Sequence, residues 1–284
     1  MKSDGWRLEA PAGLRLLDKL RKAGKPLREY VGERVYRGIT TGLNEAFVVD
    51  RTTRDQLIAE HKSSEEVLKP FVRGKDVERW RVAPQDQWLI FTRRGIDIKK
   101  YPAIQAYLKQ FIKQLTPGIS EGRKPGSYEW FEIQDNIAYW KEFEKPKIVS
   151  TKVSIRPTFA LDATGCYLGN TAYFLPAVSG ASYLLALLNS TLFLGYAKRV
   201  FVVFVEKQGG WYEVQPDGLE SFPVPVVSSE KQTPIVGLVD RILTAKRAKP
   251  TADTTAWERE IDERVYRLYD LPPEEIQIVE ESGI

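Results

Sequence analysis

The residues that most often carry chemistry are scarce in this sequence. Its 284 residues include one cysteine, Cys166, and one histidine, His61. A single cysteine cannot form an internal disulfide, and so few Cys and His residues exclude the sites in which several of them hold zinc. A Ser-His-Asp or Cys-His catalytic arrangement could use only His61. Because His61 stands in a polar stretch, Gln56 to Lys62, we predict that it is a surface side chain.

Long apolar runs are also missing. The apolar segment 181–196 contains Asn189, Ser190 and Thr191, whereas a membrane-spanning helix needs about 20 predominantly apolar residues. We therefore predict a buried core helix there and no membrane partner. The first ten residues lack the apolar core of a signal peptide, so the expected location is the cytoplasm.

Charge is unevenly distributed along the chain, although the net charge is only +4. Residues 1–160 carry 31 Lys and Arg against 21 Asp and Glu, whereas residues 161–284 carry 11 against 17. The segment 73–124 holds 12 basic and 5 acidic residues. A locally basic body is typical of a protein that meets a polyanion on one side. Charge alone, however, leaves an ordinary solvated surface as the simpler interpretation.

Residue patterns predict a mixture of helices and strands. Helical patterns cover residues 12–23, 53–62, 102–115 and 181–196. Runs rich in β-branched and aromatic residues predict strands over 46–50, 88–92, 147–151, 166–175 and 200–205. The expected fold class is mixed α/β, a twisted mixed or antiparallel sheet flanked by helices.

The character of the sequence changes at Phe222-Pro223-Val224-Pro225. This segment is predicted to be extended, because proline disfavours helix in the residue before it. Beyond it, helices are predicted over 234–248, 255–269 and 274–281. We therefore expect one domain over residues 1–228 and a C-terminal helical extension over 229–284 that packs on it.

Two glycine-containing segments predict turns. Gly38-Ile39-Thr40-Thr41-Gly42 lacks the Gly-Lys-Ser/Thr ending of a phosphate-binding loop and precedes a predicted strand where such a loop would open a helix. We interpret it as a tight turn that needs positive φ. Gly209-Gly210 predicts a hairpin turn.

Basic residues are interleaved with aromatic residues and turn formers at the ends of predicted elements. Arginine can make paired hydrogen bonds to guanine edges, while lysine mainly neutralises phosphate. Basic loops on a rigid scaffold suit duplex DNA, where side chains must reach into a groove. The candidate DNA-binding residues from this pattern are Arg93, Arg94, Lys99, Lys100, Arg123, Lys124, Lys152, Arg156, Lys198 and Arg199.

An enzymatic alternative is a Mg²⁺-dependent nuclease. Asp50 or Asp55, followed by Glu60-His61-Lys62, resembles the paired carboxylates and lysine of such sites. Residues two apart on a helix point about 200° apart around its axis, however, so a helix over 53–62 would separate Glu60 from Lys62.

A second alternative is a protein-interaction module. Trp257, Ile261 and Val265 recur at helical spacing in the predicted helix 255–269, so they form one apolar stripe. The stripe could dock a partner or pack against the body of the protein, and packing is the commoner use of such a stripe.

The motifs and their order resemble the TaqI-like C-terminal specificity (target recognition) domain of adenine-specific DNA methyltransferases. The same domain occurs in fused type II restriction-modification enzymes. The resemblance spans nearly the whole chain. It is carried by segments 36–47, with Tyr36-Arg37-Gly38 and Gly42-Leu43-Asn44-Glu45-Ala46-Phe47, by 69–77, 130–149, 169–171, 187–190 and 222–225, and by the C-terminal helices over 260–276.

This resemblance implies that residues 1–228 form a DNA target recognition domain and that Asn170, in the matched segment 169–171, is a further DNA-binding candidate. It implies double-stranded DNA and an N-terminal methyltransferase domain or subunit as partners. The sequence has no Phe-x-Gly-x-Gly and no Asn/Asp-Pro-Pro-Tyr/Phe. We therefore predict no catalytic residue, no metal and no cofactor in this chain, and expect S-adenosylmethionine in the partner catalytic domain.

Overall fold

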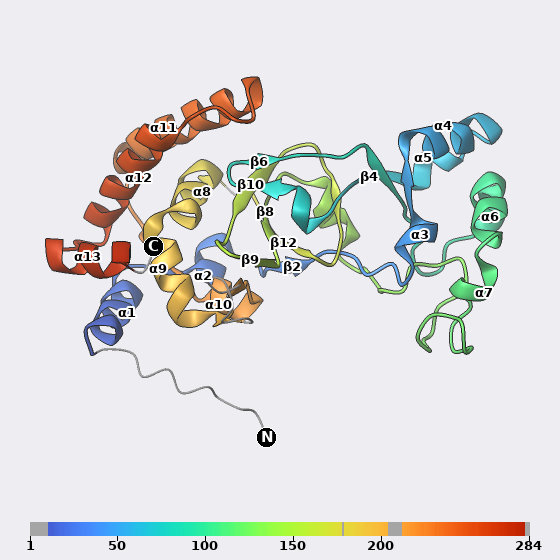
Figure 1. Ribbon diagram of the computed structural model, residues 1–284, viewed down its shortest axis with the longest axis horizontal. Coiled ribbons are helices and arrows are strands. Elements are labelled where there is room, and N and C mark those ends of the chain that lie inside the picture. The colour runs from blue at the N-terminus through green and yellow to red at the C-terminus, as the bar shows by residue number, and fades with distance from the viewer. Residues whose placement is uncertain (1–10, 178, 204–211, 282–284) are drawn as a thin grey trace. The chain divides into compact units, whose positions relative to one another are not determined.

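The computed structural model describes residues 11–177, 179–203 and 212–281 (Figure 1). The chain divides into two compact units. Unit 1 comprises residues 1–35, 153–159 and 178–284, and unit 2 comprises residues 36–152 and 160–177. The sequence predicted a boundary near residue 228, but this division by packing places residues 178–228 together with the C-terminal helices.

Unit 2 contains two four-stranded sheets. In the first, the order is β10 (Phe159–Asp162), β8 (Lys147–Thr151), β12 (Ala172–Pro176) and β2 (Tyr36–Arg37), and β12 is antiparallel to both of its neighbours. In the second, the order is β11 (Tyr167–Leu168), β4 (Leu68–Val72), β7 (Gln87–Ile90) and β3 (Val48–Asp50). There β11 is parallel to β4, while β7 is antiparallel to β4 and β3. The strand pattern is therefore mixed.

Short helices and a hairpin complete unit 2 (Figure 1). The hairpin pairs β5 (Val77–Glu78) with β6 (Arg81–Val82). The α-helices are α3 (Asn44–Phe47), α4 (Arg51–Glu60), α5 (Ser64–Val67), α6 (Pro102–Lys109) and α7 (Ile112–Leu115), and the 3₁₀ helices are η1 (Gly74–Asp76), η2 (Ile98–Lys100) and η3 (Trp140–Glu144). Their apolar faces enclose one core in which Phe143 stacks on Tyr167 with ring centroids 5.1 Å apart.

Unit 1 is mostly helical. Its helices are α1 (Pro11–Ala23), α2 (Leu27–Val31), α8 (Ala181–Asn189), α9 (Thr191–Val200), α10 (Pro216–Glu220), α11 (Ser229–Ala248), α12 (Thr255–Leu268) and α13 (Pro273–Glu281). Helix α11 packs on α8 and α12, and α13 packs on α9. Two small antiparallel sheets complete the unit, β1 (Lys25–Pro26) with β15 (Pro223–Val224), and β13 (Val202–Val203) with β14 (Tyr212–Glu213) and β9 (Val153–Ser154).

The mixed α/β class and the C-terminal helices are confirmed, but four predicted elements are interrupted. The strand predicted over 46–50 starts as the helical turn α3, and the helix over 102–115 breaks between Lys109 and Ile112. The strand over 166–175 breaks at residues 169–171, and the helix over 181–196 breaks at Ser190. Of the strand over 200–205, Val202–Val203 form β13, while Val200 ends α9. Gly209-Gly210 lies outside the described residues.

The turn at Gly38–Gly42 is confirmed, and both glycines are required by its geometry. Gly42 has φ +88°, a backbone conformation that favours glycine. A Cβ at Gly38 would lie 2.0 Å from the carbonyl oxygen of Gly169. The two backbones approach this closely because Ile39 forms a bridge with Gly169, and Asn170 N donates to Ile39 O at 3.0 Å. The turn therefore supports the segment that carries Asn170.

No helix among the described residues is long and apolar enough to cross a membrane. The predicted core helix over 181–196 is instead the α8–α9 pair, in which residues 183–190 are buried.

Candidate nucleic-acid interface

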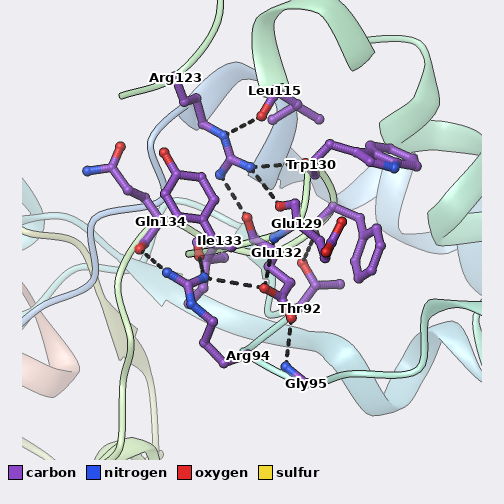
Figure 2. A network of polar contacts seen from close by, with 12 residues as sticks. Thr92, Arg94, Gly95, Leu115, Arg123, Glu129, Trp130, Glu132, Ile133 and Gln134 are labelled. Carbon is purple, nitrogen blue, oxygen red and sulfur yellow. Dashed lines mark hydrogen bonds and ion pairs between the residues drawn. The ribbon is translucent and has the colours of Figure 1, made fainter. Parts of the chain in front are cut away.

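Arg93 and Arg94 follow strand β7 and point to different surroundings. Arg94 is half-buried, and its guanidinium donates from Nη1 to Ile133 O and from Nη2 to Gln134 O, both at 2.6 Å (Figure 2). Arg93 is exposed, and its guanidinium carbon lies 5.3 Å from the ring centroid of Trp140. Arg94 therefore holds the loop, while Arg93 faces solvent.

The loop after β7 is fastened to residues 129–134 by further polar contacts. Ile133 N donates to Thr92 O at 2.9 Å, and Gly95 N donates to Glu132 Oε1 at 2.6 Å (Figure 2). The Glu132 carboxylate is buried and lies 3.5 Å from the Arg94 guanidinium. These contacts give the loop a fixed position, so Arg93 is presented from a rigid base.

Arg123 lies in the interior. Its side chain is 5% exposed, and its five N–H groups donate to five backbone carbonyls at 2.7–3.2 Å. Figure 2 labels four of the accepting residues, Leu115, Glu129, Trp130 and Glu132. The accepting carbonyls belong to Leu115, Thr41, Glu132, Glu129 and Trp130. Burial lowers the pKa of Arg123 to about 10, so the group stays charged at neutral pH. Arg123 therefore links the backbone of its own loop to the backbone of the Gly38–Gly42 turn through hydrogen bonds.

Lys124, the next residue, is exposed. Lys99 and Lys100 are exposed too, in the 3₁₀ helix η2. The backbone of η2 is fixed at both ends, because Asp97 accepts from Lys99 N at 3.2 Å and Ser63 Oγ donates to Lys100 O at 2.7 Å. Lys99 and Lys100 therefore have a fixed backbone and a side chain that is exposed to solvent.

Asn170 is exposed and lines an open depression of about 230 Å³. Its other walls come from residues 40–45, where Thr41 Oγ1 donates to Asn44 Oδ1 at 2.8 Å. Asn44 and Glu45 were not selected from the sequence, because the motif 36–47 was used to identify the family and only its segment Gly38–Gly42 was interpreted structurally, as a turn. Lys152, which follows β8, is half-buried, and its backbone N–H donates to Thr171 O at 2.8 Å.

Three more candidate cations lie in unit 1 and affect one another electrostatically. Burial lowers the pKa of Lys198, and the nearby cations Arg199 and Arg156 lower it further. Burial also lowers the pKa of Arg156, while Asp262 opposes that shift. Arg199 Nη1 donates to Gly195 O at 2.8 Å. These residues form a half-buried cluster of positive charge within unit 1.

The groups of the nuclease alternative have other partners. Asp50 caps helix α4 by accepting from Thr53 N at 2.8 Å, and this hydrogen bond lowers the pKa of its carboxyl group. Lys62 pairs with Glu65 at 2.5 Å, and Arg54 with Asp55 at 2.6 Å. Among the described residues, no group of three or more His, Cys, Asp or Glu side chains is arranged to hold a metal ion. Nothing in this arrangement favours a nuclease.

The apolar stripe of the protein-interaction alternative faces inward. Ile261 and Val265 are buried in unit 1, and Trp257 is half-buried. The stripe therefore packs against the body of its own unit.

Comparisons with solved structures show a likeness in fold to restriction-modification enzymes. The fold is similar to that of the type IIL restriction-modification enzyme MmeI, whose structure was solved in complex with DNA. The TM-score is 0.59 at 15% sequence identity, and the match covers 87% of this chain. The type IIG restriction endonuclease BpuSI matches with a TM-score of 0.47 at 12% identity over 94% of this chain. No curated protein matches the sequence.

The family is shown by a direct match. The model of the TaqI-like C-terminal specificity domain matches residues 69–224, more than half of the chain, so the chain belongs to this family. The resemblance seen in the sequence is thereby confirmed. The chain covers 34% of the length of MmeI and 34% of that of BpuSI, so it spans about a third of each.

Proposed function

We propose that this chain reads the DNA target sequence for an adenine-N6 DNA methyltransferase or a fused restriction-modification enzyme, and carries out no chemistry itself. Its membership of a specificity-domain family is the observation that carries the proposal. The exposed cations on anchored loops in unit 2 support it, because groove readout needs side chains held in fixed positions.

Within unit 2, the exposed cations have complementary tasks. Lys99, Lys100 and Lys124 neutralise phosphates, which fixes the position of the protein on the duplex. Arg93 and Asn170 are the side chains best suited to base edges, because arginine pairs with guanine and asparagine with adenine. The half-buried Arg94 and the buried Arg123 hold the loops and do not touch DNA.

The half-buried candidate residues are expected to attract DNA by their charge and not to recognise individual bases. The unit 1 cluster of Arg156, Lys198 and Arg199 adds positive charge that attracts the phosphate backbone. Lys152 of unit 2 adds another cation at the end of β8. We expect these four residues to raise the affinity for any duplex and to contribute little to the choice of sequence.

The chemistry belongs to a partner in this proposal. A methyltransferase domain or subunit N-terminal to this module would bind S-adenosylmethionine and receive the adenine after it is rotated out of the duplex. The module would hold the flanking duplex so that the correct adenine lies at the catalytic centre. Methyl-transfer motifs in the coding sequence directly upstream would support this arrangement, and an unrelated gene there would count against it.

The direct test is selection from a random duplex library with the full chain, alone and together with the catalytic partner. The proposal expects a defined consensus sequence and affinity that falls as salt rises, because bound phosphates release counterions. Recovery of unenriched sequence with both samples would refute sequence recognition. Loss of all duplex binding at low salt would refute DNA binding altogether.

A further inference from the structure

Unit 2 contains a second concave site, lined by aromatic residues, of which the proposed function uses only Arg93 at the rim. Its cavity volume is about 190 Å³. The floor is formed by Phe91 and Tyr167, which are buried and lie 4.8 Å apart between ring centroids. Trp140 and Tyr101 line it as half-buried side chains. Pockets for drug-sized ligands measure roughly 300–1,000 Å³, so this one fits a small planar group.

Two cations stand beside these rings. The Arg93 guanidinium carbon lies 5.3 Å from the Trp140 centroid, and Lys69 Nζ lies 5.9 Å from the Tyr167 centroid. Among the described residues, Arg93 has no hydrogen bond or ion pair through its guanidinium, so its donors can meet a ligand phosphate. The pocket therefore joins aromatic ring faces to two cations, of which Lys69 also pairs with Glu144 at 3.5 Å.

Two carboxylates are held in place by the tyrosines. Tyr101 OH donates to Glu66 Oε2 at 2.9 Å, and Tyr167 OH donates to Glu144 Oε1 at 3.0 Å. Burial raises the pKa of both tyrosines, so both hydroxyls remain donors. An ionised carboxylate has about four acceptor positions, and one hydrogen bond leaves the Glu66 oxygens able to accept from an amino group.

We propose that this pocket binds a single unpaired nucleobase of DNA, stacked against Trp140 and Tyr101, with Glu66 accepting from the exocyclic amino group and Arg93 contacting the adjacent phosphate. Stacking platforms with nearby cations are how proteins hold single-stranded nucleotides. The inference rests on the proposed function, because it takes the ligand from a duplex already bound by the module. Adenine and cytosine carry an exocyclic amino group and thymine does not, so the pocket favours the first two.

The test compares duplexes that differ only at one extrahelical position. Fluorescence anisotropy with the full chain would measure binding to a matched duplex and to duplexes with a bulged adenine, cytosine, thymine or abasic nucleotide. The bulged adenine should bind about ten-fold more tightly than the abasic bulge, the gain expected from one stacked base. Thymine should fall between them. Saturation-transfer NMR with free dAMP separates a pocket for free nucleotides from one that needs DNA.

Ile96→Trp fills the pocket, since Ile96 is a half-buried residue of its wall. It should abolish the preference for the bulged adenine and leave affinity for the matched duplex unchanged. Trp140→Ala should also abolish the preference, because it removes the stacking surface; since Arg93 lies over the Trp140 ring, this variant is judged only by the ratio between the adenine and abasic bulges. The matched control is Ile112→Trp, because Ile112 is 39% exposed on α7 and outside the pocket; it should keep the preference.

The outcomes separate this inference from the proposed function. Wild-type protein that binds neither matched nor bulged duplexes would refute the proposed function. Wild-type protein that binds adenine and abasic bulges equally, or a preference that survives Ile96→Trp, would refute the nucleobase pocket while leaving the proposed function intact. Binding of dAMP without any preference for the bulged duplex would refute DNA as the source of the base.

Discussion

Two pairs of adjacent cations are divided between the interior and the surface. In one pair Arg94 is pinned to backbone carbonyls while Arg93 is exposed, and in the other Arg123 is buried while Lys124 is exposed. All four have the same formal charge and stand beside turn formers, so composition could not separate them. What separates them is the set of carbonyls that each side chain meets after folding. Those carbonyls lie 39 and 40 residues away for Arg94, and for Arg123 they include Thr41, 82 residues away.

The Arg123 and Lys124 pair gives a matched test. Arg123→Lys can supply at most three of the five N–H donors, so at least two of the five hydrogen bonds are lost. Thr41 O and Glu129 O keep a second donor, because they also accept from Gln134 N and Glu132 N. Each lost hydrogen bond costs about 1 kcal/mol, so the free energy of unfolding should fall by about 2 kcal/mol in urea denaturation. Lys124→Gln should leave stability unchanged and weaken DNA binding. Equal stability of the two variants would contradict the assignment of Arg123 as a structural residue.

A buried ion pair between Lys147 and Asp162 was not predicted from the sequence. Lys147 is fully buried on β8, and its Nζ donates to Asp162 Oδ2 at 2.5 Å and to Phe143 O at 2.6 Å. Lys147→Met leaves the Asp162 carboxylate buried without its cation, which costs about 3–5 kcal/mol. Lys145→Met is the control, because Lys145 is 58% exposed in a surface pair with Glu142. Chemical denaturation that finds the two variants equally stable would refute the structural role of the pair.

At the level of elements, periodicity identified where helices and strands lie better than where they end. The helices over 12–23 and 255–269 match α1 and α12 closely, because each has one uninterrupted apolar stripe. The segment 181–196 breaks at its polar triplet Asn189, Ser190 and Thr191, which the sequence analysis used only to argue against a membrane span. Ser190 interrupts it because its backbone is extended, at φ −71° and ψ 159°, and its Oγ accepts from Phe193 N at 3.1 Å to cap α9.

This cap predicts a measurable difference between two serines at helix starts. Ser190→Ala removes the side-chain acceptor from α9 and should lower the free energy of unfolding by about 1 kcal/mol. Ser228 occupies the corresponding position before α11 but makes no capping hydrogen bond through its side chain. Ser228→Ala should therefore have a smaller effect in the same urea titration. A larger loss in Ser228→Ala would show that the break at Ser190 has another cause.

For the whole molecule, the sequence predicted the fold class, the C-terminal helices and the family, because these depend on patterns spread over the entire chain. The packing division was not predictable in the same way. Unit 1 joins residues 153–159 to the N-terminal and C-terminal segments, and no local composition marks such long-range packing. The basic segment 73–124 lies wholly in unit 2, which is where the exposed candidate cations Arg93, Lys99, Lys100 and Lys124 are found.

The claim that exposed cations of unit 2 grip the DNA backbone is tested most directly by the salt dependence of binding. The logarithm of the association constant should fall linearly with that of the salt concentration, with a slope of about −0.9 per neutralised phosphate. The double variant Lys99→Gln and Lys100→Gln should reduce the magnitude of that slope by about 2. Lys109→Gln with Lys113→Gln removes equal charge from exposed residues of the same basic segment. Neither lysine is among the candidate DNA-binding residues, so this double variant should leave the slope unchanged. A salt-independent affinity, or the same change of slope in both double variants, would contradict the account.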